Sequence, residues 1–166
     1  MAGEREFEIA QAETAQEIAA ARELFEEYQR WTGVDLCFQG FAAELAALPG
    51  DYAPPRGRLL LARRDGEVAG CVALRDAGGG SGEMKRLYVR PQFQGAGLGR
   101  RLVEELLAAA RAIGYRRLLL DTLPMMATAQ ALYERLGFRD IPPFRANPVP
   151  GARYMALTLE RPPEGR

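Results

Sequence analysis

The stretch that decides the fold is Val89-Arg90-Pro91-Gln92-Phe93-Gln94-Gly95-Ala96-Gly97-Leu98-Gly99-Arg100. It begins at the end of an apolar strand, places three glycines in five residues, and runs directly into an amphipathic helix. Glycines leave backbone N–H groups uncovered, and the N-terminus of a helix carries a partial positive charge that favours anions. The stretch therefore predicts a strand, a phosphate-binding turn and a helix, with the pyrophosphate of a nucleotide-bearing cofactor as the expected ligand.

Glycine spacing separates the loops that hold phosphate in this way. A Walker loop needs a Gly-Lys pair, but the only lysine of the chain is Lys85. A dinucleotide fingerprint needs its third glycine where this chain has Arg100, so Gly99 comes one place early. A tight strand-to-helix turn without a ligand stays open as the structural alternative.

Three motifs in order resemble the GNAT superfamily, the acetyl-CoA-dependent N-acyltransferases. Gln94-x-x-Gly97-x-Gly99 is similar to its Q/R-x-x-G-x-G/A loop, and residues 129–138 are similar to its A-x-x-L-Y-x-x-x-G-F signature. Residues 84–91 look like the strand that precedes the loop, so the resemblance covers residues 58–141. It implies a mixed α/β fold with about four helices flanking a twisted, mostly antiparallel sheet. In that family the sheet is splayed between its fourth and fifth strands, here residues 83–89 and 117–122, and the cofactor lies in the split.

Composition narrows the class of protein further. A length of 166 residues predicts one domain, residues 1–166, with 161–166 as a polar tail. The 22 basic and 22 acidic residues give zero net charge, which argues against nucleic-acid or polybasic membrane surfaces. The absence of histidine removes the commonest metal ligand and general base, so no metal is expected. Without a signal region or an apolar run approaching ~20 residues, a cytoplasmic protein is the expectation.

Periodicity predicts the remaining elements. Thr14 and Glu17 form a capping box for a helix that ends near Gly33. Further helices are expected at 41–48, from 98 to Gly114, and around Tyr133, with strands at 7–9, 58–63, 68–74, 83–89, 117–122 and 154–159. The glycine-rich segment 76–82 is predicted to be flexible, and 141–151 to be a proline-rich loop.

The resemblance also implies the cofactor contacts. Backbone groups of the fourth strand would pair with the acyl-pantetheine arm as an added strand does, and the loop amides would hold the pyrophosphate. The expected cofactor-binding residues are Leu87, Tyr88, Val89, Gln94, Gly95, Ala96, Gly97, Leu98, Gly99 and Arg100. Arg100 either adds charge there or pairs with Glu104. Many members carry asparagine seven residues before the motif tyrosine; here that position is Met126, which offers only apolar contact.

Tyr133 matches the tyrosine that the family uses as general acid. A phenol with a pKa of about 10 stays protonated at neutral pH and can donate to a leaving thiolate. The base is open between Glu83, Asp121, and solvent or another group, with either carboxylate acting directly or through water. The structural alternative for either carboxylate is an ion pair with Lys85 or a nearby arginine. Glu83 shares the strand face of Leu87 unless a bulge intervenes.

The acceptor pocket is expected between residues 31–50 and 141–151. There Asp35 is predicted to attract a cationic amine, Arg145 to hold a carboxylate, and Tyr154 to offer stacking surface. The resemblance implies N-acetyl transfer from acetyl-CoA in a ternary complex, and these residues predict a small or amino-acid-like amine as the acceptor. The alternatives are a non-catalytic acyl-CoA-binding module and a nucleotide-binding enzyme of another type. Neither Cys37 nor Cys71 lies in the motifs, which disfavours a cysteine acyl-enzyme.

Homodimers are common in the family, so the resemblance leaves a homodimer open.

Overall fold

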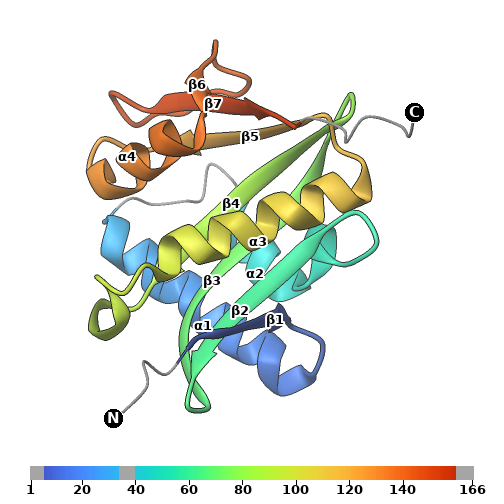
Figure 1. Ribbon diagram of the computed structural model, residues 1–166, viewed down its shortest axis with the longest axis vertical. Helices are drawn as coiled ribbons and strands as arrows, with labels where there is room; N and C mark the ends of the chain where they lie inside the picture. The colour runs from blue at the N-terminus through green and yellow to red at the C-terminus, as the bar shows by residue number, and fades with distance from the viewer. Residues whose placement is uncertain (1–5, 34–39, 160–166) are drawn as a thin grey trace.

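The computed structural model describes residues 6–33 and 40–159 of the protein. At its centre is a seven-stranded mixed sheet with the order β1-β2-β3-β4-β5-β7-β6 (Figure 1). The strands are β1 (Glu8–Gln11), β2 (Arg58–Arg64), β3 (Glu67–Gly78), β4 (Ser81–Val89), β5 (Arg117–Thr122), β6 (Arg139–Asp140) and β7 (Arg153–Thr158). Only β4 and β5 pair in parallel; the other neighbours are antiparallel. The expected mixed α/β sheet is confirmed.

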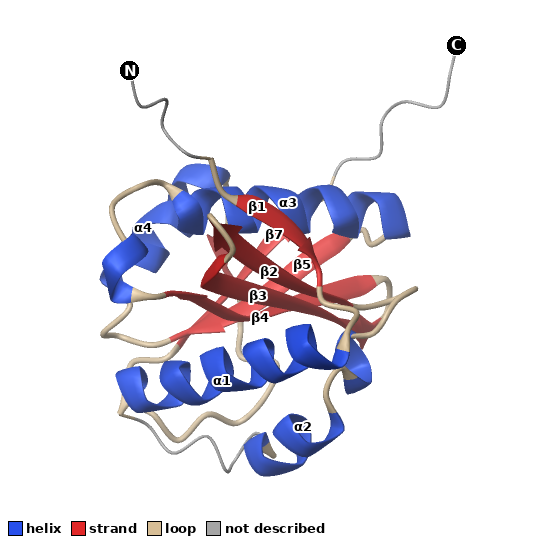
Figure 2. Ribbon diagram, turned by 90° about the horizontal axis from the view of Figure 1, so that it is seen from below, coloured by secondary structure: helices blue, strands red, loops and turns tan. Residues whose placement is uncertain are grey.

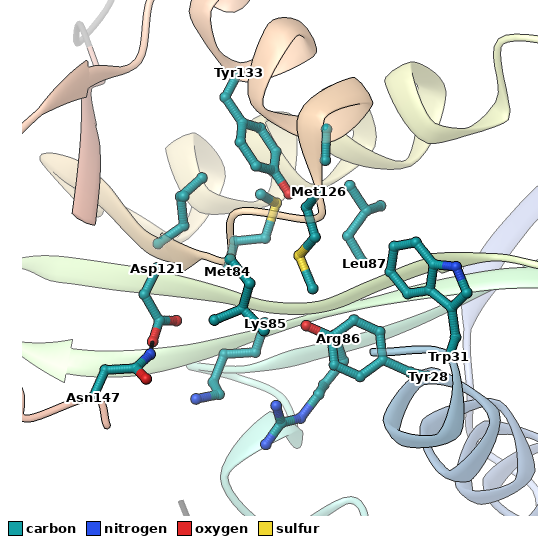
Figure 3. Close-up of a pocket in the computed structure, with 13 residues that line it drawn as sticks. Tyr28, Trp31, Met84, Lys85, Arg86, Leu87, Asp121, Met126, Tyr133 and Asn147 are labelled. Atoms are coloured by element: carbon teal, nitrogen blue, oxygen red, sulfur yellow. Dashed lines mark hydrogen bonds between the residues drawn. The ribbon is translucent and has the colours of Figure 1, made fainter. Parts of the chain in front are cut away.

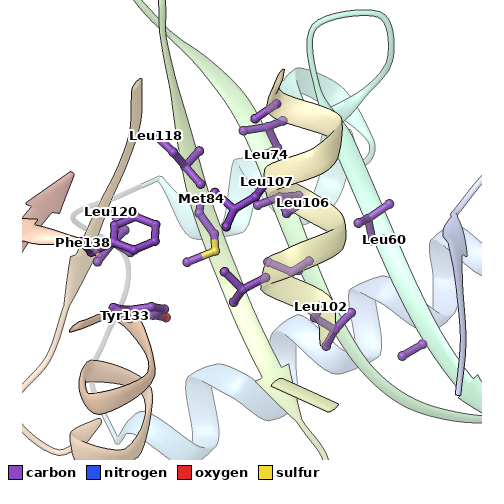
Figure 4. Packing of buried hydrophobic residues seen from close by; sticks show 14 of the residues in the cluster. Leu60, Leu74, Met84, Leu102, Leu106, Leu107, Leu118, Leu120, Tyr133 and Phe138 are labelled. Carbon is purple, nitrogen blue, oxygen red and sulfur yellow. The ribbon is translucent and has the colours of Figure 1, made fainter. Parts of the chain in front are cut away.

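The helices cover both faces of this sheet. Helices α1 (Ala15–Thr32) and α2 (Phe41–Ala47) lie on one face, and α3 (Leu98–Ile113) and α4 (Ala127–Leu136) on the other (Figure 2). Because strand side chains alternate between faces, each face has its own apolar core. Leu102 and Leu106 of α3 pack toward Met84 on the sheet (Figure 4). Within the described residues, no helix is long and apolar enough to span a membrane.

Local signals fix the helix ends as expected. The Thr14 hydroxyl accepts a hydrogen bond from the Glu17 N–H at 3.1 Å, and the Glu17 carboxylate accepts one from the Thr14 N–H at 3.0 Å. This capping box begins α1. Gly114 and Gly137 end α3 and α4 with φ angles of 106° and 101°, a left-handed conformation that glycine adopts without steric cost.

Most of the segment 76–82 is strand, whereas its glycines predict a turn over the whole segment. β3 continues to Gly78, β4 starts at Ser81, and Asp76 pairs with Gly82 across the two strands. The turn is confined to Gly79 and Gly80, which have φ angles of 62° and 81°. The prediction is wrong because long-range strand pairing overrides the low strand propensity of glycine.

The split between β4 and β5 is confirmed. The two strands pair only where Ser81, Gly82 and Glu83 face Arg117, Leu118 and Leu119. Beyond Glu83 they diverge (Figure 1). The backbone edge of β4 from Met84 onward therefore has no strand partner on the side of β5.

A β-bulge in β4 decides which side chains face which core. Arg86 has a φ of 60°, and the register with β3 shifts between the Ala73–Lys85 and Cys71–Tyr88 pairs. The bulge turns Leu87 to the side of α3, whereas Tyr88 packs in the core beneath α1 and α2. Leu87 therefore does not share a face with Glu83 and Lys85.

The bulge is held by a buried ionic network. The Arg86 guanidinium donates two hydrogen bonds to the Glu44 carboxylate of α2, at 2.9 and 3.0 Å. The Tyr52 hydroxyl donates to the same carboxylate at 2.9 Å, and the Cys71 thiol donates to the Arg86 carbonyl at 3.3 Å. A non-glycine residue in a left-handed conformation persists when its surroundings determine it in this way.

Glu44→Gln is expected to lower the free energy of unfolding by about 3 kcal/mol, because it leaves the Arg86 charge buried without its counterion. Glu104→Gln is the control: it breaks an exposed pair with Arg100 and should cost less than about 0.5 kcal/mol. Urea unfolding of both variants measures the difference. Equal losses would contradict a structural role for the Arg86–Glu44 pair.

Candidate active site

A cavity of about 60 Å³ lies in the split between β4 and β5. Tyr133 and Met126 reach it from α4 on one side of the sheet, and Tyr28 and Trp31 reach it from α1 on the other (Figure 3). The remaining lining residues are Met84, Lys85, Arg86, Leu87, Leu120, Asp121, Leu123, Ala129 and Asn147. A group that enters from the side of α4 can therefore meet a group that enters from the side of α1.

The glycine loop forms an open anion cradle at the N-terminus of α3. Gly95 and Gly97 have φ angles of 85° and 78°, and no side chain caps the helix. A Cβ atom built at Gly95, Gly97 or Gly99 would have no heavy atom within 4 Å. The first N–H groups of a helix lack partners inside the helix, so these amides are available to a phosphate. The loop fits the pyrophosphate of acetyl-CoA.

Side chains around the loop anchor it to the fold. The Gln94 amide nitrogen donates to the Val89 carbonyl at 3.1 Å, which ties the loop to the end of β4. Leu98 is buried in the core beneath α3. The Arg100 guanidinium donates to Glu104 at 2.7 Å on the exposed side of the helix, so the pair expected from the i,i+4 spacing is present. A contact of Arg100 with phosphate stays a prediction.

The unpaired edge of β4 runs past the cavity. Leu87 lines the cavity, and the ring of Tyr88 packs against Tyr28 and Trp31 with centroids 6.3 and 6.2 Å apart. Val89 packs against the core beneath α3. The side chains of these three residues are thus fixed by packing, which leaves their backbone groups at a defined edge for a pantetheine arm.

Tyr133 reaches the cavity from the buried side of α4. Its ring packs on Phe138 with centroids 5.6 Å apart, and the residue is only 5% exposed. Burial, with smaller effects of Tyr28 and Asp121, raises the pKa of the Tyr133 phenol well above its ordinary value. The phenol is therefore protonated at neutral pH and available as a donor. Tyr133 lies deeper than the flank position that the helical spacing predicted.

Met126 stands at the start of α4 and lines the same cavity. The Thr122 hydroxyl donates to its sulfur at 3.6 Å. The thioether offers the cavity an apolar contact, as expected from its sequence position.

Glu83 is fully buried and surrounded by cations. Its carboxylate accepts hydrogen bonds from Arg75 at 2.9 Å and Arg145 at 2.5 Å, and the Lys85 ammonium lies 3.8 Å away. Burial alone raises the pKa of Glu83, but the Arg145 hydrogen bond and the charges of Lys85, Arg145 and Arg75 outweigh it and lower the pKa below its ordinary value. Such a carboxylate is a weak base.

Asp121, the other predicted carboxylate, lines the cavity together with Tyr133. Its Oδ2 atom accepts a long hydrogen bond from the Asn147 amide and lies 3.5 Å from Arg145 Nη1. Arg145 therefore links Glu83 to Asp121. The structure brings all three predicted catalytic side chains to one region, with Asp121 and Tyr133 at the cavity itself.

Of the three residues predicted to bind the acceptor, the structure describes Arg145 and Tyr154. Arg145 contacts Glu83 and Asp121, and its carbonyl accepts a hydrogen bond from the Tyr154 hydroxyl at 2.8 Å. Tyr154 also packs edge-on against Phe144, so it holds this segment in place. Asp35 lies outside the described residues.

Sequence reasoning missed Tyr28, Asn147 and Lys85 as cavity residues. Burial lowers the pKa of Lys85 to about 8, against the opposing effect of Glu83. The available signal was the only lysine of the chain, which stands beside Arg86 in a strand segment whose other residues from Met84 to Val89 are apolar or aromatic. Asn147 lies in a segment without periodicity, and Tyr28 belongs to an ordinary helical stripe, so neither had a comparable signal.

Comparison with known proteins agrees with this geometry. Residues 12–138 match the acetyltransferase (GNAT) family. An uncharacterised N-acetyltransferase of Schizosaccharomyces pombe is 39% identical over 155 residues, 92% of this chain and 95% of its own length. The IAA acetyltransferase of Azospirillum brasilense is 42% identical over 144 residues, 86% and 90% of the two lengths. The structure of a Streptococcus agalactiae acetyltransferase shares the fold, with a TM-score of 0.77 at 22% identity over 92% of this chain and 98% of that one. The chain belongs to the GNAT family of N-acetyltransferases.

Proposed function

We propose that the protein transfers the acetyl group of acetyl-CoA to the primary amine of a small, amino-acid-like acceptor while both substrates are bound. The observation that carries this proposal is the cavity that joins Tyr133 and Asp121 in the β4–β5 split, beside the open glycine loop. A small acceptor agrees with the relative whose name gives IAA as its substrate. When bound, acetyl-CoA supplies a thioester whose carbonyl carbon an amine can attack.

In this proposal the groups around the split divide cofactor binding and proton transfer between them. The amides at the start of α3 bind the pyrophosphate, and the backbone edge of β4 orients the pantetheine arm. Tyr133 donates its proton to the departing sulfur, since the phenol remains protonated at neutral pH. Asp121 accepts the proton of the attacking amine, directly or through water, because it lines the cavity.

Glu83 has a different role in this proposal. Two arginines donate hydrogen bonds to its Oε1 atom, and its lowered pKa makes it a poor proton acceptor. We therefore assign it a positioning role: it holds Arg145, which in turn contacts Asp121.

Direct transfer is favoured over an acyl-enzyme by the state of Cys71. The thiol is buried, donates to the Arg86 carbonyl, and has its pKa raised by burial. A thiol in this environment is not an activated nucleophile. Cys37 lies outside the described residues.

Gly97→Trp is expected to abolish acetyl-CoA binding, because the new side chain fills the open space at the start of α3. Gly66→Trp is the matched control: Gly66 in the β2–β3 turn has a φ of 79° and equally open surroundings. Calorimetry with acetyl-CoA, and with NAD and ATP as comparison ligands, measures binding. Equal weakening by both variants, or tighter binding of NAD, would contradict the assigned cradle.

Tyr133→Phe is expected to lower kcat by about 100-fold, the usual contribution of a general acid, with little change in the KM for acetyl-CoA. Thiol release with the best acceptor from an amine panel measures turnover. Tyr115→Phe is the control, because the Tyr115 hydroxyl donates to the Arg56 carbonyl and does not line the cavity. An unchanged kcat in Tyr133→Phe would remove the tyrosine from the mechanism.

Glu83→Gln is expected to lower the free energy of unfolding at pH 7 by about 3 kcal/mol, because it removes a buried carboxylate from contact with the buried Lys85 and the partly buried Arg75 and Arg145. The lowered folded pKa means that the stabilisation is present above the unfolded value of about 4.3 and is lost as pH falls through the folded value. Urea unfolding from neutral to acidic pH should show a steeper loss in the wild type than in the variant. Parallel curves would argue against the ion cluster.

A further inference from the structure

Trp31 is a large apolar residue that stays accessible beside the cavity. It lies in the last turn of α1, lines the cavity together with Tyr28, and is 49% exposed (Figure 3). Tryptophan side chains are highly buried on average, so an exposed one beside a candidate active site is a candidate ligand contact. The only other exposed large hydrophobic residue in the described part of the chain is Met125, which does not line the cavity.

The ring of Trp31 is held by two tyrosines. Its centroid lies 6.3 Å from that of Tyr28, one helical turn earlier, and 6.2 Å from that of Tyr88 on β4. Tyr88 also packs edge-on against Tyr28, and its hydroxyl donates a long hydrogen bond to Glu27 at 3.5 Å. The Glu27 carboxylate is in turn paired with Arg90 at 2.7 Å. The indole is therefore oriented before a ligand arrives, which lowers the entropic cost of binding.

The size of the cavity requires most of an acceptor to lie outside it. Its volume is about 60 Å³. Small-molecule pockets usually have about 300–1,000 Å³, and benzene binds in a cavity of about 150 Å³. The cavity therefore has room for the reacting groups, and the rest of the acceptor must lie on accessible surface next to it. On the side of α1, from which the proposed acceptor enters, Trp31 supplies such a surface.

The surroundings of Trp31 favour a flat apolar group over a cation. Aromatic rings bind ligands of either kind. The Arg86 guanidinium already lies over the Tyr28 ring, 5.9 Å from its centroid, so a cation bound there would meet another positive charge. Among the described residues no cation lies over the Trp31 ring, and Leu87 adds an apolar side chain to the same cavity. The indole is thus suited to packing against a ring of the acceptor.

We infer that Trp31 recognises an aromatic ring on the acceptor and thereby determines acceptor specificity. The inference rests on the proposed function, since it takes the end of the cavity facing α1 as the entry of the amine. In this arrangement the amine reaches Asp121 inside the cavity, while the ring packs against Trp31 at its edge. The acceptor class is a primary amine that carries an aromatic ring.

Because Trp31 is the only tryptophan of the chain, intrinsic tryptophan fluorescence reports on this site alone. The probes are 2-phenylethylamine and 2-cyclohexylethylamine, which carry a primary amine on the same linker and differ in the aromaticity of the ring. Calorimetry on the full chain with CoA present should give about fivefold tighter binding of the phenyl compound, and its binding should change the Trp31 emission. Equal affinities, or an emission that stays constant when calorimetry shows the site filled, would overturn the inference.

Substitutions of Trp31 separate ring packing from general apolar contact. Trp31→Leu should remove the preference for the phenyl compound, because it keeps an apolar side chain without a ring, and Trp31→Phe should keep most of it. In turnover, Trp31→Leu should raise the KM for 2-phenylethylamine about fivefold and leave kcat and acetyl-CoA affinity unchanged. Met125→Leu is the matched control, since it changes the exposed apolar residue away from the cavity and should alter none of these values. A phenyl preference that survives in Trp31→Leu would overturn the inference.

Failure of the proposed function and failure of this inference give different results. Absence of thiol release with every amine of the panel, aliphatic or aromatic, would overturn the proposed transfer. Thiol release with 2-phenylethylamine and 2-cyclohexylethylamine at equal KM would overturn the role of Trp31 and leave the transfer intact.

Discussion

The constraint on which the rest of the structure depends is the short pairing of β4 with β5. The strands pair over three residues of each and then separate. A longer ladder would satisfy the backbone edge of β4 and close the space between the strands. Because the pairing stops at Glu83, the sheet contains an opening that side chains from both of its faces reach, and the glycine loop follows β4 in the chain. The cavity that the proposed function assigns to both substrates depends on this interruption of the sheet.

The bulge at Arg86 divides the polar residues of β4 into two groups with different consequences. The Arg86 guanidinium donates to the Glu44 carboxylate, which also accepts a hydrogen bond from Tyr52. The charge of Arg86 is therefore neutralised inside the protein, where it stabilises an unusual backbone conformation. Glu83 and Lys85 precede the bulge and belong to a second ion cluster, in which Glu83 pairs with Arg75, Lys85 and Arg145. Two buried cations that are adjacent in sequence thus belong to different clusters: Arg86 pairs with Glu44 in the bulge network, and Lys85 lies beside Glu83 and lines the cavity.

Sequence reasoning predicted what local patterns encode. The glycine loop, the capping box of α1, the glycine ends of α3 and α4, and Tyr133 beside the split all follow from spacing within a few residues. It could not predict the bulge, because nothing in the residues around Arg86 favours a positive φ. Nor could it find the partners of Glu83, since Arg145 lies 62 positions away and meets it only through the fold. The glycines of 76–82 predicted too long a turn, because strand pairing, a long-range effect, determines their conformation.

The two ends of the cavity differ in electrostatic character, and this difference determines which substrate the proposed function assigns to each end. At the end facing α4, Tyr133 is buried among apolar groups, and its raised pKa keeps it a neutral proton donor. At the end facing α1, carboxylates and cations meet beside aromatic rings. A thiolate that leaves near Tyr133 needs a proton, whereas a charged acceptor needs counterions and a proton acceptor. In the proposed function the thioester therefore lies on the side of α4, the amine enters from the side of α1, and the two react in the opening between β4 and β5.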